Sequence, residues 1–430
     1  MKLRQYQIEA VNAGLSSRNG VLVLPTGSGK SLICAGLVSE LGCDDGILVL
    51  QPSLEILKTN LAKAKLFGID VNVYSASAGK KSVGKVTYAT IGSIINKLDQ
   101  FSHCRTILID ECHLVNAKGG MYDKLIKTMR PDRLLGMTAT PYRLASNSYG
   151  SFMRILTRTR PKLFNDILHI TNPRELVDQG YLLEPKYEIV DIKESMLKPN
   201  STGAEFTEAS KDRFSKENSI PHKIVTLIQE LDHKHILVFV ESVADSKWIA
   251  GELNIIGIKA SEINANTNKR LRESELSLYE SGDIRVMVNV GTLTTGYDFP
   301  ALDCIVDGNP TMSAALHYQK IGRVVRPFPG KSPIVYDVSG NLKRLGNPMN
   351  YTLLKNATGN NYELYSETGR ITTRNIADGP ECEFRINFGK HSGKRLSEVE
   401  SGYLEWASKD LSGEMRHVFY SEKIRRSLIV

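Results

Sequence analysis

A glycine-rich loop between an apolar run and a helix-like run is the clearest chemical feature of the sequence. The segment VLVLPTGSGKS ends in the residues Pro25, Thr26, Gly27, Ser28, Gly29, Lys30 and Ser31. Glycines let backbone N–H groups turn toward phosphate oxygens, and a following helix points its positive end at the same anion. Lys30 would reach the outer phosphates of a nucleotide, and the Ser31 hydroxyl would bind Mg²⁺. Leu24 replaces the first glycine of the simple phosphate-loop pattern, but the strand before and the helix after argue against a chance turn.

An acidic pair follows the apolar run Ile107–Ile109 in the segment TILIDECH. If that run is a strand, its end presents Asp110 and Glu111 together. Asp110 would then hold Mg²⁺, directly or through water, and Glu111 would polarise the attacking water as general base. A solvated acidic pair is the ordinary alternative, but its place after an apolar strand, one set of strands beyond Lys30, favours catalysis.

Length, charge and cysteine use limit the class of protein. The chain has 430 residues, enough for two or three domains, and 41% of them are apolar. Its formal charge of +8 is mild evidence for a polyanionic partner. The six cysteines form no CxxC pair, and no apolar run approaches the roughly 20 residues that span a bilayer. We therefore expect a reduced, soluble, cytoplasmic protein without zinc, and exclude collagen, coiled-coil, membrane and disulfide-scaffold classes.

Short apolar runs alternate with helix-like stretches up to about Leu345, which indicates α/β units with parallel sheets covered on both faces. The expected strands are Val21–Leu24, Ile47–Leu50, Val71–Tyr74, Val86–Tyr88, Ile107–Ile109 and Leu134–Met137, then Tyr187–Val190, Ile236–Val240, Ile258–Ile263, Arg285–Val290, Cys304–Val306 and Ile334–Val338. The expected helices are Leu32–Leu41, Ser53–Leu66, Tyr122–Met129, His222–Leu231, Val243–Ile256 and Lys269–Ser281.

This alternation predicts two similar domains, 1–145 and 181–346, joined by a polar linker region at 146–180. The second domain carries a polar insertion near 194–219, which is either a long loop or a helical excursion. It either projects toward a nucleic acid or is a plain flexible loop. Residues 347–430 are less periodic and would form a small third module.

Four ordered motifs resemble those of superfamily 2 helicases over about three quarters of the chain. They are PTGSGKS at 25–31, DECH at 110–113, TAT at 138–140 and QKIGRVVR at 319–326. The resemblance implies two tandem RecA-like domains that use ATP and Mg²⁺, and a coupling role for His113, Thr138 and Thr140. Cys112 replaces the alanine common in the acidic box and Ser31 the frequent threonine, but neither change removes a group that the reaction needs.

Two further segments resemble nucleotide-contacting motifs of the same family. In LRQYQ, the Gln7 amide can pair with both the donor and the acceptor of an adenine edge, and Arg4 can stack on the base. The alternative is a plain amphipathic first helix. In TLTTGYDFP, Thr294 and Thr295 can donate to a phosphate, while Asp298 meets the ribose or couples the two sites. The alternative there is a polar turn after a strand.

The arginines of QKIGRVVR lie three residues apart, so on a helix Arg323 and Arg326 would share one face. With Gln319 and Gly322 they complete the family pattern, which implies that one or both reach the γ-phosphate as arginine fingers. A solvated basic face is the usual alternative. With ATP between the two domains, nucleotide binding would favour a closed state and hydrolysis would let the domains open.

Small hydroxyl side chains after several expected strands are candidate contacts to a nucleic-acid backbone. They are Ser53, Thr90, Ser93, Ser242, Thr267 and Thr294. Such contacts hold phosphates and sugars without identifying bases. Each of these residues is about equally well explained as an ordinary helix N-cap.

The resemblance is closest to phage and bacterial helicases that remodel branched DNA. VYDVSGNLKRLGNP at 335–348 looks like the RadD type, although this chain lacks the cysteines of that type's zinc module. We therefore expect a monomer in a bacterial or phage-infected cytoplasm. It would bind single-stranded and forked or branched DNA, and would use ATP to unwind or branch-migrate the forked or branched forms. A 3′-to-5′ polarity is implied by the resemblance alone. The alternatives are a duplex translocase or restriction-type motor subunit, an RNA helicase, and a nucleotide-dependent clamp with negligible turnover.

The tail segment INFGKHSGKRLSEV resembles a small module at the ends of some exonucleases and phage proteins. Its glycines and basic residues would form a tight turn that meets phosphate. Phe388, Tyr403 and Trp406 can stack on unpaired bases, but the core of the small module explains these aromatics better.

Overall fold

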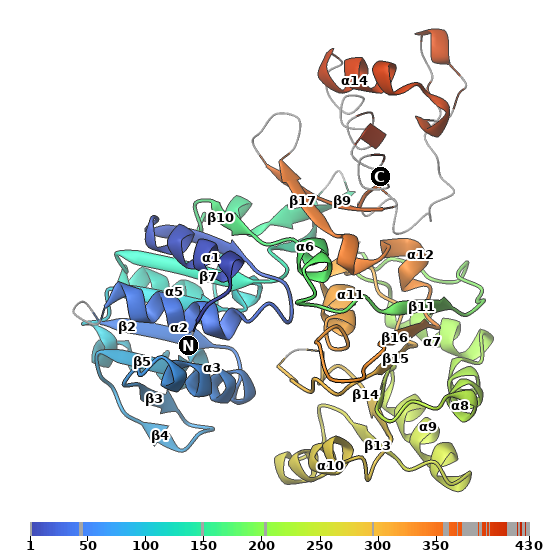
Figure 1. Ribbon diagram of the computed structural model, residues 1–430, viewed down its shortest axis with the longest axis horizontal. Helices are drawn as coiled ribbons and strands as arrows, with labels where there is room; N and C mark the ends of the chain where they lie inside the picture. Colours follow the sequence, from blue (N-terminus) through green and yellow to red (C-terminus); the bar gives the residue numbers. More distant parts are fainter. Residues whose placement is uncertain are drawn as a thin grey trace. The chain divides into compact units, whose positions relative to one another are not determined.

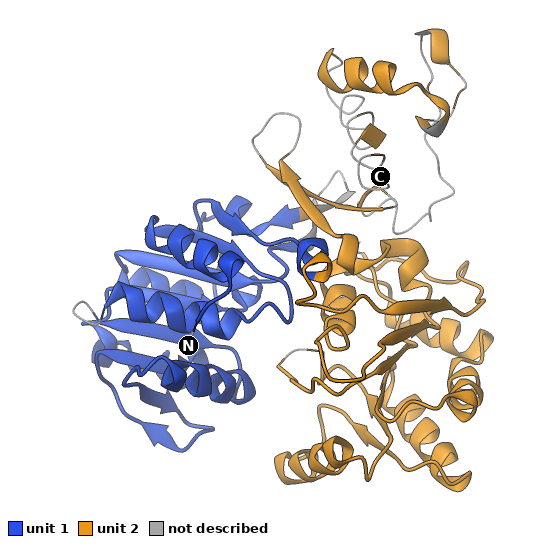
Figure 2. Ribbon diagram, viewed as in Figure 1, with its two compact units in different colours: residues 1–143, 154–176 blue, residues 144–153, 177–430 orange. Residues whose placement is uncertain are grey.

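The computed structural model describes most of the chain, in two compact units (Figure 2). The described residues are 2–42, 46–147, 150–201, 204–294, 296–355, 361–367, 369–371, 386, 389–392, 394, 396–410, 419, 422–423 and 426. The first unit comprises residues 1–143 and 154–176, and the second comprises 144–153 and 177–430. Thr295 and Phe388, which the sequence analysis singled out, lie outside the described residues.

The first unit is built around an eight-stranded sheet with the strand order β10-β1-β7-β6-β2-β5-β3-β4. Its strands are β1 (Asn19–Val23), β2 (Ile47–Gln51), β3 (Asn72–Ser75), β4 (Lys80–Lys81), β5 (Val86–Thr90), β6 (Thr106–Asp110), β7 (Arg133–Thr138) and β10 (Ile167–Ile170). All neighbours are parallel except β3 and β4. Strands β2 and β6 are buried at every residue, as expected for a sheet covered on both faces.

Helices α1 (Gln5–Leu15), α2 (Lys30–Leu41) and α3 (Leu54–Leu66) lie side by side against this sheet (Figure 1). The remaining helical segments are α4 (Ile91–Ile94), α5 (Met121–Met129) and the 3₁₀ turns Leu98–Phe101, Cys112–Leu114 and Leu156–Arg158. Leu37 and Leu57 of the helices pack with Leu22, Val49 and Leu135 of the strands, all of them fully buried. Every strand and helix expected in this part of the chain is present.

The second unit contains a six-stranded sheet that is parallel throughout, in the order β11-β16-β15-β12-β14-β13. Its strands are β11 (Lys186–Ile189), β12 (Ile236–Phe239), β13 (Ala260–Ile263), β14 (Val286–Asn289), β15 (Cys304–Asp307) and β16 (Ile334–Asp337). Its helices are α7 (Glu208–Glu217), α8 (Ile220–Glu230), α9 (Val243–Ile255), α10 (Lys269–Ser281), α11 (Ala314–Ile321) and α12 (Asn341–Leu345). The prediction of two doubly wound, RecA-like α/β units is confirmed.

The expected linker at 146–180 contains ordered structure. Strand β10 lies within it and pairs in parallel with β1, so this stretch extends the first sheet. It also contains β9 (Gly150–Ile155), which forms a two-stranded sheet with β8 (Tyr142–Asn147), and helix α6 (Pro173–Asp178). The short apolar run ILHI, set among polar residues, gave too weak a pattern to be recognised as a strand.

The polar insertion near 194–219 folds onto the second unit rather than forming a plain loop. It contains α7, whose Phe214 is fully buried, and Phe206 just before it is also buried. Lys211 of α7 lies 3.2 Å from Glu241, and Ser215 donates a hydrogen bond of 2.9 Å to Asp245. Two buried phenylalanines and these polar contacts attach the segment, in agreement with the helical excursion that was one of the two expectations.

The C-terminal part begins with an antiparallel sheet of β17 (Thr352–Lys355), β18 (Tyr362–Ser366) and β19 (Gly369–Arg370). Beyond it are the 3₁₀ turns Gly389–His391 and Leu396–Glu398 and the helix α14 (Ser401–Asp410). A separate small core of Ile386, Leu396, Val399, Leu404, Ala407 and Phe419 holds this last segment together. Among the described helices of the chain, none combines the length and apolarity that crossing a membrane would need.

Candidate nucleotide site and nucleic-acid edge

Three neighbouring strands of the first sheet end beside one another and carry the chemical groups predicted from the sequence. β1 leads into the glycine loop, β7 ends at Thr138, and β6 ends at Asp110. Because these strands are parallel, their carboxyl ends lie at one edge of the sheet, where open α/β folds bind ligands. The sheet order therefore places the phosphate loop, the acidic pair and the TAT segment together.

The glycine loop is shaped by two left-handed residues and held by the first helix. Gly27 has φ 85° and Gly29 φ 80°, values that side chains rarely adopt. A Cβ on Gly29 would also lie only 2.7 Å from the Gln7 amide nitrogen. Tyr6 and Gln7 both donate to the carbonyl of Ser28, at 2.7 and 3.0 Å. Helix α1 therefore fixes the loop that would receive phosphate.

Both ends of the Gln7 amide are used inside the protein. Its oxygen accepts a hydrogen bond of 3.0 Å from the backbone N–H of Arg4, and its nitrogen donates to Ser28. An amide oxygen has a second lone pair and an amide nitrogen a second hydrogen. Recognition of adenine by Gln7 thus stays a prediction, one that uses the remaining capacity of a side chain already tied to the phosphate loop.

Glu111 lies at the centre of a chain of polar contacts. Its carboxylate oxygens are 3.4 Å from the Lys30 ammonium nitrogen and 3.3 Å from His113 Nδ1. The same His113 nitrogen is 2.8 Å from the Thr138 hydroxyl, which accepts from the backbone N–H of Thr140 at 3.0 Å. The predicted link between the acidic pair and the TAT segment is present in the structure. A continuous chain of contacts therefore joins Glu111 to the backbone of Thr140.

Asp110 is buried, and each of its carboxylate oxygens accepts one hydrogen bond from a neutral donor. Asn60 donates to one carboxylate oxygen at 2.8 Å, and the backbone N–H of Glu111 donates to the other at 2.9 Å. Burial, followed by the nearby charge of Glu111, raises the pKa of Asp110 to about 6. Lys30 and the two hydrogen bonds oppose that rise.

The side-chain donors at this edge suit Mg²⁺, which also takes ligands from phosphates and water, better than a metal ion that needs all its ligands from the protein. In the part of the chain that the structure describes, no three His, Cys, Asp or Glu side chains gather as a metal site. The ligands predicted from the sequence are one carboxylate, Asp110 at the end of β6, and one hydroxyl, Ser31 on the first turn of α2. Mg²⁺ is commonly bound by one or two carboxylates together with substrate phosphates and water. The donor set matches that mode.

The arginine segment departs from its prediction. Helix α11 ends at Ile321, so Arg323 and Arg326 lie in the turns that follow and do not share a helix face. Gly322 and the β-branched pair Val324 and Val325 are poor helix formers, which explains the early end. The two arginines consequently have different environments.

Arg323 is buried and binds backbone carbonyls of its own unit. Its guanidinium donates to the carbonyl of Thr294 at 2.6 and 3.2 Å and to the carbonyl of Tyr297 at 2.5 Å. It thereby ties the turn after α11 to the TLTTGYDFP segment. The side chain of Gln319 is also buried, at the last full turn of α11.

Arg326 is partly exposed and forms an ion pair with Asp298 of the TLTTGYDFP segment. Its backbone carbonyl accepts from Lys331 at 2.8 Å, and the same ammonium donates to the carbonyl of Pro300 at 2.9 Å. Burial, together with the charge of Arg326, lowers the pKa of Lys331 to about 8. Of the two arginines, Arg326 is therefore the one whose guanidinium can exchange a side-chain partner for a phosphate.

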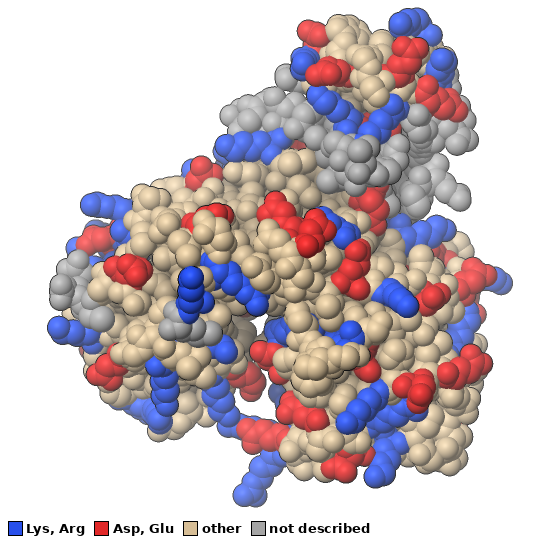
Figure 3. Space-filling model, in the orientation of Figure 1, with Lys and Arg blue, Asp and Glu red and all other residues tan. Residues whose placement is uncertain are grey.

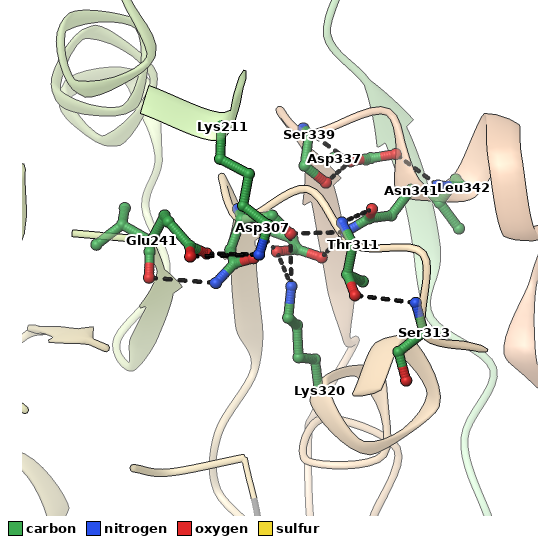
Figure 4. Close-up of polar contacts among 12 residues, drawn as sticks. Lys211, Glu241, Asp307, Thr311, Ser313, Lys320, Asp337, Ser339, Asn341 and Leu342 are labelled. Carbon is green, nitrogen blue, oxygen red and sulfur yellow. Dashed lines mark hydrogen bonds and ion pairs between the residues drawn. The ribbon is translucent and has the colours of Figure 1, made fainter. Parts of the chain in front are cut away.

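A buried polar network anchors α11 to the carboxyl ends of β15 and β16 (Figure 4). Lys320 lies 2.7 Å from Asp307, with both side chains almost completely buried, and also donates to the carbonyl of Asn309. Asn341 donates to the second oxygen of Asp307 at 2.9 Å. Asp337, beside Asp307 in the sheet register, accepts from Ser339 and from the N–H of Leu342. The contacts of Lys320 thus fix the last turn of α11, which also carries Gln319.

Replacing Lys320 with methionine is expected to lower the free energy of unfolding by about 3–5 kcal/mol, because Asp307 would be left buried without its cation. It is also expected to lower the kcat of ATP hydrolysis, since Lys320 adjoins Gln319 and precedes Arg323 by three residues. The double variant Asp307→Asn/Lys320→Met removes both charges and should regain most of the stability. Chemical denaturation measures the first effect and steady-state ATPase assays the second. A single variant as stable as the parent chain would contradict the assignment.

The candidate nucleic-acid contacts of the first unit lie beside the nucleotide residues on the same sheet edge. Ser53 follows β2 and Thr90 ends β5, and β2 and β5 are parallel neighbours next to β6. Ser53 caps α3 by accepting from the N–H of Ile56 at 3.3 Å. Thr90 and Ser93 lie 2.8 Å apart, and Ser93 accepts from the N–H of Ala76. The N-cap explanation therefore describes Ser53 but not Thr90.

In the second unit the three hydroxyl candidates also follow adjacent strands. Ser242, Thr267 and Thr294 come after β12, β13 and β14, which are consecutive in the sheet. Ser242 caps α9 through Asp245, and the Thr267 hydroxyl accepts from the N–H of Asn264 at 3.0 Å. Their local hydrogen bonds explain these residues without a ligand. Figure 3 shows Lys and Arg interspersed with Asp and Glu, so the face in view has no region of one charge.

Several site residues were not predicted from the sequence. Asn60 is the clearest, because it lies at a helix spacing that shares a buried face with Leu57 and Ala64. A polar residue at such a position was the available signal. Tyr6 and the pair Lys320–Asp307 gave no comparable pattern, since their partners are distant in the sequence.

Comparisons with known proteins agree with this geometry. A family model described as "Type III restriction enzyme, res subunit" matches residues 1–143, and one described as "Helicase conserved C-terminal domain" matches residues 220–327. A 51.5 kDa protein of a Lactococcus phage (isolate 7-9) is 23% identical over 83% of this chain and 72% of its own length. A DNA 3′-5′ translocase XPB2 of Sulfurisphaera tokodaii is 23% identical over 76% of this chain and 79% of its own.

Solved structures support the fold. A fragment of a putative HsdR subunit of a type I restriction enzyme from Vibrio vulnificus YJ016 has a TM-score of 0.61 at 18% identity, and the alignment covers 80% of this chain and 66% of that one. This chain spans about half the length of several other curated relatives.

The fold and the loop with its acidic partners define an ATPase of two RecA-like units. The two family matches fall on those units, so the chain is similar to superfamily 2 enzymes and is an ATP-dependent helicase-type enzyme.

Proposed function

We propose that this protein is a DNA helicase that translocates on single-stranded DNA and unwinds or branch-migrates forked and branched substrates. The observation that carries the proposal is the arrangement of the first sheet. One edge of this sheet carries the phosphate loop, the TAT segment and the acidic pair at the ends of β1, β7 and β6. The hydroxyls proposed to contact a nucleic-acid backbone follow the adjoining strands β2 and β5. Hydrolysis and the grip on a strand would thus share one rigid element.

The chemistry proposed for the nucleotide site assigns one role to each group. Lys30 and the loop N–H groups hold the phosphates of ATP, Ser31 and Asp110 bind Mg²⁺, and Glu111 orients and deprotonates the attacking water. Mg²⁺ bound there neutralises phosphate charge. Arg326 contacts the γ-phosphate in the transition state.

Several relatives support DNA as the substrate. The archaeal relative is called a DNA 3′-5′ translocase, and others are called DNA 3′-5′ helicases or ATP-dependent DNA helicases. A 3′-to-5′ polarity is proposed on the same basis. Because one relative is a phage protein, a bacterial or phage-infected cytoplasm is proposed as the location.

Nucleic-acid-stimulated ATPase activity tests the proposal. We expect ATP turnover to rise at least about tenfold with single-stranded or forked DNA, and less with RNA of the same sequence. DNA affinity should fall steeply with salt, because the proposed contacts are to phosphates. A panel of fork, four-way junction, blunt duplex and RNA hybrid then identifies the unwinding substrate. Turnover that is equal with and without every nucleic acid would contradict a motor function.

A duplex translocase is the second candidate, since the likeness to restriction-enzyme subunits favours it. The same panel separates the two. Stimulation by blunt duplex without any strand separation would identify a translocase, whereas unwinding of forks would identify a helicase.

A further inference from the structure

The helix α14 near the C-terminus buries one face and leaves an aromatic flank outside. Leu404 and Ala407 pack into the small core with Leu396 and Phe419. Trp406 is 45% exposed, although tryptophan is usually largely buried. Among the described residues, this is one of only two tryptophans, and it is the more exposed of the two. The small core therefore does not account for Trp406, although the sequence analysis preferred to explain this aromatic residue as part of that core.

Trp406 is held in place by a second aromatic ring. The ring of Tyr403, one turn earlier on α14, lies 5.2 Å from it between centroids at 46°. Tyr403 itself contacts Phe419 at 5.8 Å and His391 at 4.3 Å. An exposed ring already fixed by its neighbours loses little rotational freedom when a flat ligand stacks on it, so binding such a ligand costs less entropy.

Cations surround this aromatic pair. The Lys390 ammonium lies 5.7 Å from the Tyr403 centroid. Lys409 and Lys423 both reach Glu405, the residue before Trp406, at 3.0 and 3.3 Å. Two ammonium groups thus share the Glu405 carboxylate next to the exposed ring, and a third lies over the ring of Tyr403. Alternating aromatic and cationic groups of this kind match the bases and phosphates of an unpaired strand.

His391 supplies an independent sign of a missing partner. It is 5% exposed, and neither of its ring nitrogens has a hydrogen-bond partner among the described residues. A buried polar group without a partner is costly, which makes a ligand or ordered water beside it favourable. Its ring lies 4.3 Å from that of Tyr403, tilted by 59°, so a molecule on the aromatic flank would pass close to it.

We propose that this module, defined as the described residues from Ile386 to Arg426, is a second binding site for single-stranded nucleic acid. One base stacks on Trp406 beside Tyr403, and the neighbouring phosphates contact Lys390, Lys409 and Lys423. An unpaired strand is required, because the faces of bases in a duplex are covered by stacking. The proposal depends on the proposed function only in taking nucleic acid as the ligand, and it needs neither ATP nor the motor residues.

The two tryptophans permit a direct test in the full chain. Trp248→Phe leaves Trp406 as the only tryptophan, and its fluorescence then reports on the module. Titration with a thymidine oligonucleotide in the absence of ATP is expected to quench this fluorescence to saturation. An abasic backbone of equal length should quench little, because it offers no base to stack. The same quenching is expected when Lys30→Ala is added to Trp248→Phe.

Matched variants separate stacking from folding. Trp406→Leu keeps an apolar side chain without an aromatic face, and is expected to weaken oligonucleotide binding roughly tenfold, whereas Trp406→Phe should weaken it much less. Basal ATPase activity should be unchanged in both. Absent quenching while the oligonucleotide still binds by anisotropy and stimulates ATPase activity would overturn the second site and leave the proposed function standing. Normal quenching without any stimulation of ATPase activity would support the second site and would contradict the proposed function.

Discussion

Glu111→Gln is expected to lower the kcat of ATP hydrolysis by roughly two to four orders of magnitude while ATP still binds. Glutamine keeps the size of the side chain, and its single amide oxygen can still accept a hydrogen bond from the Lys30 ammonium, although the ion pair is lost. It also tolerates the same backbone, which is left-handed at this residue with φ 49°. The change removes the carboxylate that would accept a proton from water, and little else.

Two comparisons make this result specific. Lys30→Ala should also abolish hydrolysis, and it should weaken nucleotide binding as well, because the lysine contacts phosphates rather than water. Glu55→Gln, an exposed carboxylate in the first turn of α3, is the matched control and should behave like the parent chain. Single-turnover hydrolysis and binding of a fluorescent ATP analogue measure the two effects. Substantial activity in Glu111→Gln would show that another group is the general base.

The coupling contacts add a second readout to the same variant. Glu111 contacts His113, and His113 contacts Thr138, whose hydroxyl holds the backbone of Thr140. With the proposed general base replaced, DNA binding should persist, since the hydroxyls after β2 and β5 are untouched. Loss of both ATP and DNA binding would instead indicate misfolding.

The sheets could be predicted from the sequence because their strands are continuous apolar runs. Ile47–Gln51 and Thr106–Asp110 are buried at every residue, so no alternation of polar side chains obscured them. Strand β10 lacked that signal, since three of its four residues are only partly buried. Helix α7 was ambiguous for a related reason, because the segment around it is mostly polar and few apolar residues, among them Phe206 and Phe214, attach it.

The site was predictable where local sequence defines the geometry and was missed where distant partners define it. The phosphate loop and acidic pair follow strands directly, so spacing was enough to place them. The prediction that Arg323 and Arg326 share one helix face was wrong. Arg323 instead binds the carbonyls of Thr294 and Tyr297, and no local sequence pattern connects it to them. Asp307 and Lys320 likewise meet only in the folded sheet.

Removing Arg326 should affect turnover far more than affinity. We expect Arg326→Ala to lower kcat roughly 10³-fold or more, the effect usual for an arginine finger, with KM for ATP changed only a few-fold. The expectation follows from the surroundings of Arg326. Its guanidinium is partly exposed and forms an ion pair with Asp298, which is also partly exposed, so it could release this partner for a phosphate. Arg326→Lys keeps the charge without the planar fork and should recover only part of the activity.

Arg323→Ala should behave differently, because that guanidinium is buried against backbone carbonyls. Its loss leaves the carbonyls of Thr294 and Tyr297 without their donor, so the variant should be less stable. Thermal unfolding distinguishes the two arginines, with Arg326→Ala close to the parent chain. Arg270→Ala, an exposed arginine on α10, controls for loss of charge in the second unit.

Asp298→Asn provides the sharpest discrimination between a catalytic and a structural role for Arg326. If the ion pair only stabilises the second unit, Asp298→Asn and Arg326→Ala should lower stability and turnover by similar amounts. If Arg326 leaves Asp298 for the γ-phosphate, neutralising Asp298 frees the guanidinium, and kcat should stay within a few-fold of the parent chain. Equal losses of both kcat and stability in the two variants would therefore assign Arg326 to structure and would transfer the finger role to another residue.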